Sequence, residues 1–413
     1  MAKAYNIKSL PIGLFIISVL LLSNSCRKES FSPSQADSFI KFFGTYQNDK
    51  GADVRSLDEG GYVLAGTTTT ETSGTNIILI QTDKYGNETG TPKQFGGTFN
   101  DRAHSISVLS DGRFAILGST TVELNDQTLV TDMYFIVTDS DGNEIWSKNY
   151  NYGDNENELD IVSNEIGYSF SETSDGGFIL IGSTENLETG KKNIYLVRTG
   201  PEGEVIWTRT HGGLDDDVGF NIAETDDGFI YTGYTRNFSQ PDQSDADIFI
   251  VKTNSLGRVT FPYTYGSEGD DFGRALIPHN DGGYILLGTA TNPSSNIKNI
   301  FLGHIGEDIS QPIWTKSIGG SLNHNAACIK ITPGGNYIIT GTQELSPGNH
   351  VIFLTKTDSE GNQIFFETYG GGGLQKAEAV DITEDGGYII TGSNETGGIS
   401  MITLIKTDEN GKL

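Results

Sequence analysis

Short runs of apolar residues bounded by Gly, Asp and Asn recur along most of this chain. Residues 212–266 show the pattern most clearly, because they contain four such runs: NIAET, GFIYTGYT, DIFIVKTN and VTFPYTYG. Runs of this length with turn-forming residues at both ends are typical of β-strands. No long segment has the periodicity of an amphipathic helix. The pattern therefore predicts an all-β fold with almost no helix.

The second run of each unit begins with an aromatic residue that is followed four residues later by glycine. Seven positions fit this rule: Tyr62, Phe114, Phe178, Phe229, Tyr284, Tyr337 and Tyr388. Their spacings of 52, 64, 51, 55, 53 and 51 residues lie in the range of repeat architectures. Although 413 residues would allow two or three domains, one repeated unit from residue 38 to residue 413 predicts a single large domain.

The two ends of the chain complement each other. The first apolar run, at residues 39–43, matches the fourth run of a unit, whereas the last unit stops after its third run. Hairpin-sized linkers such as residues 139–143 make the third and fourth strands neighbours, so the fourth strand is the outer edge. Small residues in the first strand, such as Ala103 and Gly219, are attributed to crowding near an axis. We therefore predict a seven-bladed β-propeller of four-stranded antiparallel blades, closed by the N-terminal strand.

The repeat also resembles a known family. The successive segments GGLDDDVGFNI, DGFIYTGYT and DIFIVKTN of residues 212–254 are similar to the bacterial β-propeller repeat called SBBP, and to the Asp-Gly-Gly-Tyr-Ile repeats of Bacteroidetes surface lipoproteins. The resemblance covers residues 38–413 and implies the fold, but no particular chemistry. Residues 333–337 carry one extra residue, and residues 303–314 lack the hairpin signature.

Residues 1–25 predict a secretory signal, because Lys3 and Lys8 precede an apolar run that is too short to span a bilayer. Ser25 and Cys26 end it in a way that resembles a lipoprotein signal, although Ser23 stands where that family usually has Leu. The resemblance implies lipidation of Cys26. The Ser-rich polar composition that follows, with Pro33, predicts a flexible tether over residues 26–37. The predicted location is the bacterial outer membrane, lipid-anchored and facing the cell exterior. An ordinary cleaved signal is the alternative.

The charge balance argues against nucleic acid as a partner. The chain has 27 Lys and Arg against 54 Asp and Glu, a net charge of −27, which repels a phosphate backbone. Cys328 has no partner for an intramolecular disulfide once Cys26 is lipidated, and we expect a buried small side chain. The domain is expected to be monomeric and to meet the membrane only through its lipid.

The loops that join the units carry a regular set of acids. These loops emerge on the same face as those between the second and third strands, so a ligand is expected there. The candidate ligand-binding acids are Asp101, Asp215, Asp216, Asp217, Asp270 and Asp271. Such a crown could hold Ca²⁺, which prefers several oxygen ligands. We favour the alternative that a repeated Asp accepts backbone N–H groups of its own turn, so no cofactor is assigned.

Three further candidates are aromatic. His104 and His324 occupy similar places near the starts of first strands and are candidates to face the channel, with a ligand-free polar lining as the alternative. Tyr152 lies in an insertion at residues 151–167 and is a candidate to stack on a sugar, with a tolerated surface loop as the alternative. Residues 139–143, DSDGN, match only the start of a calcium-binding loop, and we interpret them as a hairpin turn.

No motif identifies a reaction. The chain has neither a Gly-x-Ser-x-Gly elbow nor a phosphate-binding Gly-x-x-x-x-Gly-Lys motif, and a carboxylate pair for glycoside cleavage would be defined only in space. The favoured hypothesis is a surface-tethered binding or scaffold propeller with a glycan or a surface protein as ligand. A polysaccharide lyase or hydrolase would instead show His, Tyr, Arg or paired acids with perturbed pKa values at the channel mouth. A structural subunit of an envelope assembly would show an apolar patch on the rim.

Overall fold

The computed structural model describes residues 38–45, 47–70, 74–124, 127–152, 162–237 and 245–413. These residues contain 28 strands and no helix, so the all-β prediction is confirmed for them, and none of them forms a helix that could cross a membrane. The predicted signal, Cys26 and the tether lie outside the described residues. The described strands all belong to one compact unit, Ala36–Leu413.

The strands follow the repeats, with a lone first strand and then four strands for each of the first six repeats and three for the last. They are β1 (Phe39–Phe43); β2 (Lys50–Ser56), β3 (Tyr62–Thr69), β4 (Thr75–Thr82), β5 (Lys93–Phe95); β6 (Asp101–Val108), β7 (Phe114–Glu123), β8 (Leu129–Thr138), β9 (Glu144–Tyr150); β10 (Ser163–Glu172), β11 (Phe178–Asn186), β12 (Lys191–Thr199), β13 (Val205–His211); β14 (Asp217–Thr225), β15 (Gly228–Thr235), β16 (Asp247–Asn254), β17 (Val259–Tyr265); β18 (Phe272–Pro278), β19 (Tyr284–Asn292), β20 (Ile297–Ile305), β21 (Pro312–Ile318); β22 (Asn323–Ile331), β23 (Tyr337–Ser346), β24 (Asn349–Thr357), β25 (Gln363–Tyr369); β26 (Leu374–Ile382), β27 (Tyr388–Thr396) and β28 (Ile399–Thr407).

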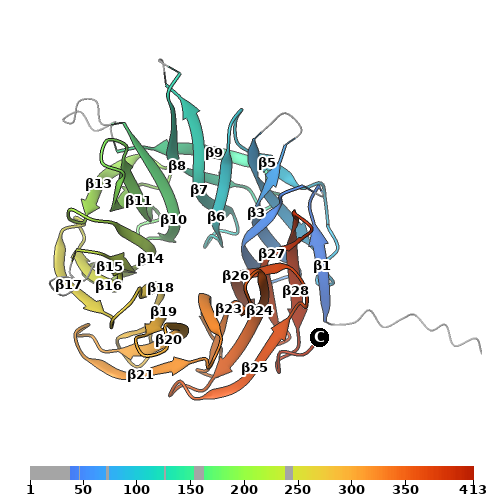
Figure 1. Ribbon diagram of the computed structural model, residues 1–413. Helices are drawn as coiled ribbons and strands as arrows, with labels where there is room; N and C mark the ends of the chain where they lie inside the picture. The colour runs from blue at the N-terminus through green and yellow to red at the C-terminus, as the bar shows by residue number, and fades with distance from the viewer. Residues whose placement is uncertain (1–37, 46, 71–73, 125–126, 153–161, 238–244) are drawn as a thin grey trace, which may run out of the picture. The chain divides into compact units, whose positions relative to one another are not determined.

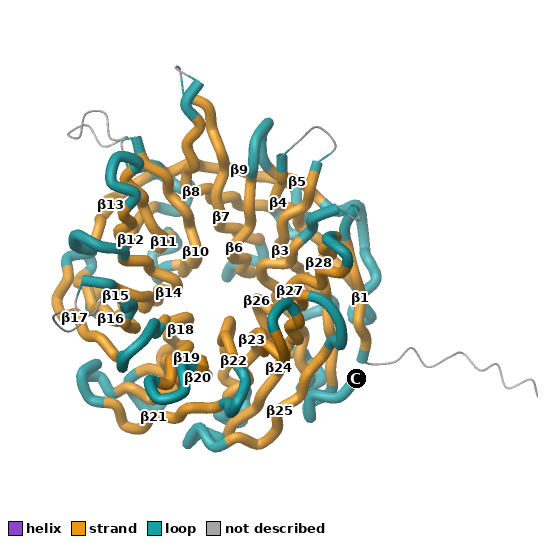
Figure 2. Tube along the Cα trace, in the orientation of Figure 1, coloured by secondary structure: helices purple, strands orange, loops and turns teal. Residues whose placement is uncertain are grey.

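The first five repeats form five separate four-stranded antiparallel sheets, each in chain order. The sixth and seventh are joined through one parallel bridge, His350 to Leu374, into a sheet of eight strands. Figure 1 shows the sheets set side by side around a common axis, with first strands such as β6, β10, β14 and β18 innermost and fourth strands such as β9, β17 and β21 outermost. Figure 2 shows loops linking the outer strand of one sheet to the inner strand of the next.

β1 completes the last repeat. It runs antiparallel to β28, with Phe39 opposite Lys406 and Phe43 opposite Ile402, as the match of residues 39–43 to a fourth strand predicted. One buried cluster joins Leu64 of the first repeat, Phe43 and Ile389 of the last. β1 also makes the side-chain hydrogen bond that other fourth strands make to the following repeat. Lys41 donates to Asn87 at 3.1 Å, in the same way as Lys93 donates to Asn143 and Lys316 to Asn362, both at 3.0 Å.

The core lies between neighbouring sheets. Ile181 and Ile194 of one sheet pack with Ile222 and Tyr231 of the next, and all four are at most 3% exposed. Because each middle strand is covered on both sides, its sequence has to be apolar on both faces. This explains why the second and third strands read as continuous hydrophobic runs rather than as alternating ones.

Each first strand carries a β-bulge, and the repeated glycine of the second strand explains how it fits. In the fourth repeat, Gly219 pairs with Gly233 and the register then shifts by one residue. A Cβ on Gly233 would collide with the carbonyl oxygen of Val218, and a Cβ on Gly219 would meet the side chain of Ile181 in the preceding sheet. The small residues are therefore required by close packing against the neighbouring sheet. This corrects our prediction that crowding near the axis requires them.

The DSDGN segment is a hairpin turn, as interpreted. Asp139 accepts hydrogen bonds from the backbone N–H groups of Asp141 at 3.0 Å and Asn143 at 2.8 Å, and Gly142 has a φ of 78°, which favours glycine. The Asp139 carboxylate therefore serves its own turn.

Candidate functional site

The repeated acids at the starts of the first strands act as anchors inside the fold. We define the anchor as the residue two positions before the start of each bulge: Asp49, Asp101, Glu165, Asp217, Asp271, His324 and Gln375. All seven are at most 7% exposed. Three candidate acids accept a backbone N–H from four residues upstream: Asp101 from Gly97 at 2.8 Å, Asp217 from Gly213 at 2.9 Å and Asp271 from Ser267 at 2.7 Å.

The other candidate acids also bind the chain itself. Asp216 accepts the backbone N–H of Lys192 at 3.1 Å, and Asp215 pairs with Lys191 at 2.8 Å. Asp270 accepts the N–H of Ala246 at 3.0 Å and pairs with Arg236 at 3.0 Å. No group of three His, Cys, Asp or Glu able to hold a metal occurs in the part of the chain that the structure describes. These contacts support the structural alternative over a Ca²⁺ crown.

His104 and His324 are not equivalent, contrary to the sequence interpretation. His324 is itself an anchor, 3% exposed, with Nε2 2.8 Å from Gln343 Nε2. His104 lies three residues after its anchor, in the bulge of β6. The two positions differ by only three places relative to the bulge, but this difference turns His324 into the sheet packing and His104 toward the axis.

Tyr152 is half-buried rather than a free platform. Its ring meets that of Tyr195 edge-on, with centroids 6.2 Å apart, and its backbone N–H bonds to the anchor Glu165. Burial raises the pKa of Glu165 to about 7. Most of the insertion beyond Tyr152, at residues 153–161, lies outside the described residues.

The extra residue of each bulge forms what we call the bulge ring. Its members are Ala52, His104, Tyr168, Phe220, Arg274, Ala327 and Glu378. They come from the innermost strands (Figure 1). Arg274 of β18 and Glu378 of β26 interact electrostatically although β22 lies between their strands. The bulge ring therefore faces the axis.

A second ring lies two residues earlier, between each anchor and its bulge. We call it the entry ring: Lys50, Arg102, Ile166, Val218, Phe272, Asn325 and Lys376. Three charged members interact electrostatically with the bulge ring: Lys376 and Lys50 with Glu378, and Arg102 with His104. The two rings together line the start of each first strand on the side away from the anchors.

One side of the axis is aromatic. The ring of Tyr168 lies 5.2 Å from His104 and 5.1 Å from Phe220, edge-on in both cases. Tyr234 continues the row, 6.0 Å from Phe220 and 5.2 Å from Phe272. The guanidinium of Arg274 lies 4.7 Å from the centroid of Phe220, a cation–π distance.

Enclosure by protein changes the protonation of this cluster. Burial, helped by Arg102, lowers the pKa of His104 to about 4, so its imidazole is neutral at pH 7. Desolvation by the surrounding first strands raises the pKa of Tyr168 and, against the opposing effect of Arg274, that of Glu378, although the Glu378 side chain is exposed. Arg274 keeps its charge, although burial lowers its pKa from 12.5.

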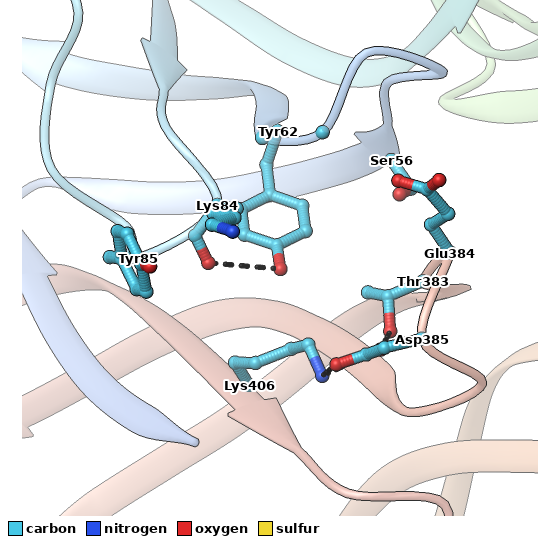
Figure 3. Close-up of a pocket in the computed structure, with 10 residues that line it drawn as sticks. Ser56, Tyr62, Lys84, Tyr85, Thr383, Glu384, Asp385 and Lys406 are labelled. Atoms are coloured by element: carbon cyan, nitrogen blue, oxygen red, sulfur yellow. Dashed lines mark hydrogen bonds and ion pairs between the residues drawn. The ribbon is translucent and has the colours of Figure 1, made fainter. Parts of the chain in front are cut away.

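A separate cavity of about 410 Å³ lies between the first and last repeats, on turns at the opposite ends of the strands from the anchors. Figure 3 shows Lys406 directed at Asp385 and the Tyr62 hydroxyl directed at the carbonyl of Lys84. Lys406 is 3% exposed and lies 2.8 Å from Asp385. The same pairing occurs in the third repeat, where Arg198 binds Asp175 at 2.6 Å. Because the charge repeats between blades and is already paired, we do not assign this cavity as the site.

The axial residues Tyr168, Phe220, Arg274 and Glu378 were not predicted from the sequence. The signal was present, because each stands three residues after an anchor. It was hidden where Glu165 or Gln375 replaces the usual Asp, and a bulge is needed to turn the third residue toward the axis.

No protein-family model and no curated protein sequence matches this chain. Solved structures do. The β-propeller domain of the Trilobed protease from Pyrococcus furiosus is 12% identical, over 89% of this chain and 96% of that one, with a TM-score of 0.49. A protein of unknown function from Dyadobacter fermentans is 11% identical, over 89% and 97%, with a TM-score of 0.50. A puromycin hydrolase is 10% identical, over 84% and 50%, with a TM-score of 0.50. These likenesses, at 12% identity or less, are of fold alone and carry no activity.

Proposed function

We propose that residues 38–413 form a seven-bladed propeller, closed by β1, that binds a sugar ligand at the two axial rings. The observation that carries this proposal is the aromatic row on the axis, Tyr168, Phe220 and Phe272, next to the neutral imidazole of His104. Aromatic rings fixed by a rigid scaffold offer flat apolar surface at low entropic cost. The SBBP resemblance has no family-model match behind it and remains part of the proposal.

A second candidate, a polysaccharide lyase or hydrolase, is favoured by the composition of the bulge ring. It brings together His104, Tyr168, Arg274 and Glu378, the residue types that we expected of an enzyme. Their pKa directions weigh against it, because a general base works best with a pKa near the operating pH. His104, with a pKa of about 4, is a weak base, and Tyr168 is held protonated. We therefore rank binding first.

The rim gives little support to a structural subunit. Exposed apolar side chains occur on four different outer strands, in Ile145, Ile206, Ile313 and Ile364, each 51–60% exposed. Since these strands belong to separate sheets around the axis (Figure 1), the residues are spread over the rim. A docking site would gather such side chains in one patch.

We further propose that lipid on Cys26 tethers the propeller to the outer membrane, facing outward. The support is the sequence alone: Lys3 and Lys8, the apolar run and Ser25-Cys26. Cys26→Ala should release the protein from membranes into the culture fluid. Unchanged membrane retention of this variant would contradict the lipid anchor.

The sugar-binding proposal is tested with the full chain, purified in detergent, on a glycan array followed by calorimetry with the best ligand. Phe220→Ala should weaken binding by about 10-fold, the value of one lost aromatic contact of roughly 1.4 kcal/mol. Phe261→Ala is the matched control, because Phe261 is 43% exposed on the outer strand β17. Shortening of a polymer ligand during incubation would favour the enzyme. Equal binding by both variants, or no saturable binding, would contradict the proposal.

A further inference from the structure

The axis is positively charged on one side, although the chain as a whole has a net charge of −27. Lys376, Lys50 and Arg102 occupy the entry ring in the seventh, first and second repeats. These repeats are neighbours, because β2 of the first repeat contacts β26 and β27 of the seventh and β6 of the second. We call the junction of the first and last repeats the seam. All three side chains are exposed. Among the described residues none of them takes part in a recorded ion pair, whereas Lys191, Lys330, Lys406 and Lys412 are each paired with a carboxylate.

One acid opposes these cations. Glu378 is the only carboxylate in the two rings, and Lys376, Lys50 and Arg274 all act on it. The charge of the two rings is thus four cations, Lys50, Arg102, Arg274 and Lys376, against one carboxylate. Four cations that share one carboxylate leave a net positive charge on the axis, and this charge attracts an anion. Of the other acids of this face, Asp216 and Asp270 are engaged with backbone N–H groups, and Glu185 acts on Tyr168.

The opposite side of the entry ring is apolar: Ile166 and Phe272 are half-buried, and Val218 between them is buried. A ligand on the axis would therefore meet unpaired cations on one side and, on the other, aromatic rings over which Arg274 and Lys298 lie at 4.7–6.0 Å. A sugar ring carrying an acidic group has these two properties, a flat C–H face and a charged edge. An acidic peptide would supply the charge but not the regular flat faces.

We propose that the axial rings recognise an anionic oligosaccharide, carboxylated or sulfated, with its acidic groups on Lys376, Lys50 and Arg102 and its ring faces on Tyr168, Phe220 and Phe272. This inference rests on the proposed sugar-binding function and names its ligand class. It gives the three cations a role that the fold does not require, since each is exposed and unpaired.

The test compares the full chain with two triple variants in detergent, at low salt. One removes the axial cations, Lys50→Gln, Arg102→Gln and Lys376→Gln. The matched control, Lys84→Gln, Lys148→Gln and Arg258→Gln, removes the same charge from exposed residues outside the rings. Among them, Lys84 lines the cavity between the first and last repeats. The probes are oligogalacturonate, a sulfated chondroitin oligosaccharide, neutral dextran oligomers and poly-glutamate.

The axial variant should bind oligogalacturonate or the sulfated probe roughly 10- to 30-fold more weakly, the sum of three screened ion contacts, and the control variant should bind like the original chain. The affinity should fall with added salt. Comparing the carboxylated and sulfated probes identifies the acidic group. Three results would overturn the anionic-sugar assignment: tighter binding of dextran than of the acidic sugars, equal loss of affinity in both triple variants, or tighter binding of poly-glutamate than of the acidic sugars. In each case the Phe220→Ala variant would still decide whether the protein binds sugar at all. Failure of every probe, with no effect of Phe220→Ala, would overturn both.

Discussion

Adjacent phenylalanines in β1 allow a direct test of how the two ends of the chain hold together. Phe43 is 8% exposed and packs with residues of both the first and the last repeats, whereas Phe42 is 46% exposed. Truncating a buried Phe to Ala removes roughly 130 Å² of apolar contact, worth about 3 kcal/mol at ~25 cal/mol per Å², in line with measured Phe→Ala losses. Phe42→Ala loses about half that area or less, so we expect about 1 kcal/mol, part of it strand propensity.

The free energy of unfolding is measured by equilibrium urea denaturation, followed by the fluorescence of the three tryptophans. Phe43→Ala should lower it by about 2 kcal/mol more than Phe42→Ala does. Hydrogen exchange locates the effect, because the β28 amides that pair with β1, around Ile402 and Leu404, should lose protection selectively in Phe43→Ala. Equal losses in the two variants, or unchanged protection of β28, would refute the view that β1 seals the last blade.

Three further predictions concern the interior. Gly233→Ala should destabilise the protein by about 2–4 kcal/mol, because the added Cβ would collide with the Val218 carbonyl. The control Gly97→Ala, with open space around it, should change stability by less than about 0.5 kcal/mol. Similar urea midpoints for the two variants would contradict the view that the bulge requires glycine at position 233. The pKa of Glu165 is raised from 4.5 to about 7, so the folded state binds a proton more tightly than the unfolded state, and this group's contribution to stability is full below pH 4.5 and is lost as the pH rises toward 7. Glu165→Gln should therefore flatten that part of the curve of stability against pH. The control variant Glu188→Gln, at an exposed residue, should leave the curve intact. Asp385→Asn should lower the free energy of unfolding by about 2–4 kcal/mol, because it leaves buried Lys406 without its partner. Asp111→Asn, in the exposed pair with Arg113, should lower it by less than about 1 kcal/mol. Equal losses in the two variants would mean that the cavity between the first and last repeats does not depend on its ion pair.

The repeat made most of the fold predictable from the sequence. All seven aromatic positions, Tyr62 and its equivalents, lie at or next to the start of a second strand, because period, glycine spacing and turn residues are local signals. The pairing of β1 with β28 followed from counting runs at the two ends. These inferences needed no knowledge of side-chain direction.

The site was less predictable, because direction is what the sequence conceals. A one-residue bulge reverses which side chains face the axis, so His104 and His324 looked alike although only His104 lies in the bulge ring. Acid-rich loops suggested an acidic mouth, but Asp101, Asp217 and Asp271 turn inward to bind backbone N–H groups. The exposed charges on the axis are Lys50, Arg102, Lys376 and one acid, Glu378, so the local net sign is opposite to that of the whole chain.

The cationic side of the axis spans the seam, so closure and ligand binding can be compared in one variant. Lys376 comes from the last repeat and Lys50 from the first, and β1 is the strand that links those repeats. If Phe43→Ala leaves about 2 kcal/mol or more in favour of the closed ring that we propose, over 95% of molecules stay closed, and the apparent affinity falls by less than about 5%. We therefore expect Phe43→Ala to bind an anionic oligosaccharide with unchanged affinity at 25 °C and to lose binding at a lower temperature than the original chain on heating. A large loss of affinity at 25 °C, with β28 still protected from exchange, would show that the seam positions the cations directly, and that β1 belongs to the binding site rather than only to the scaffold.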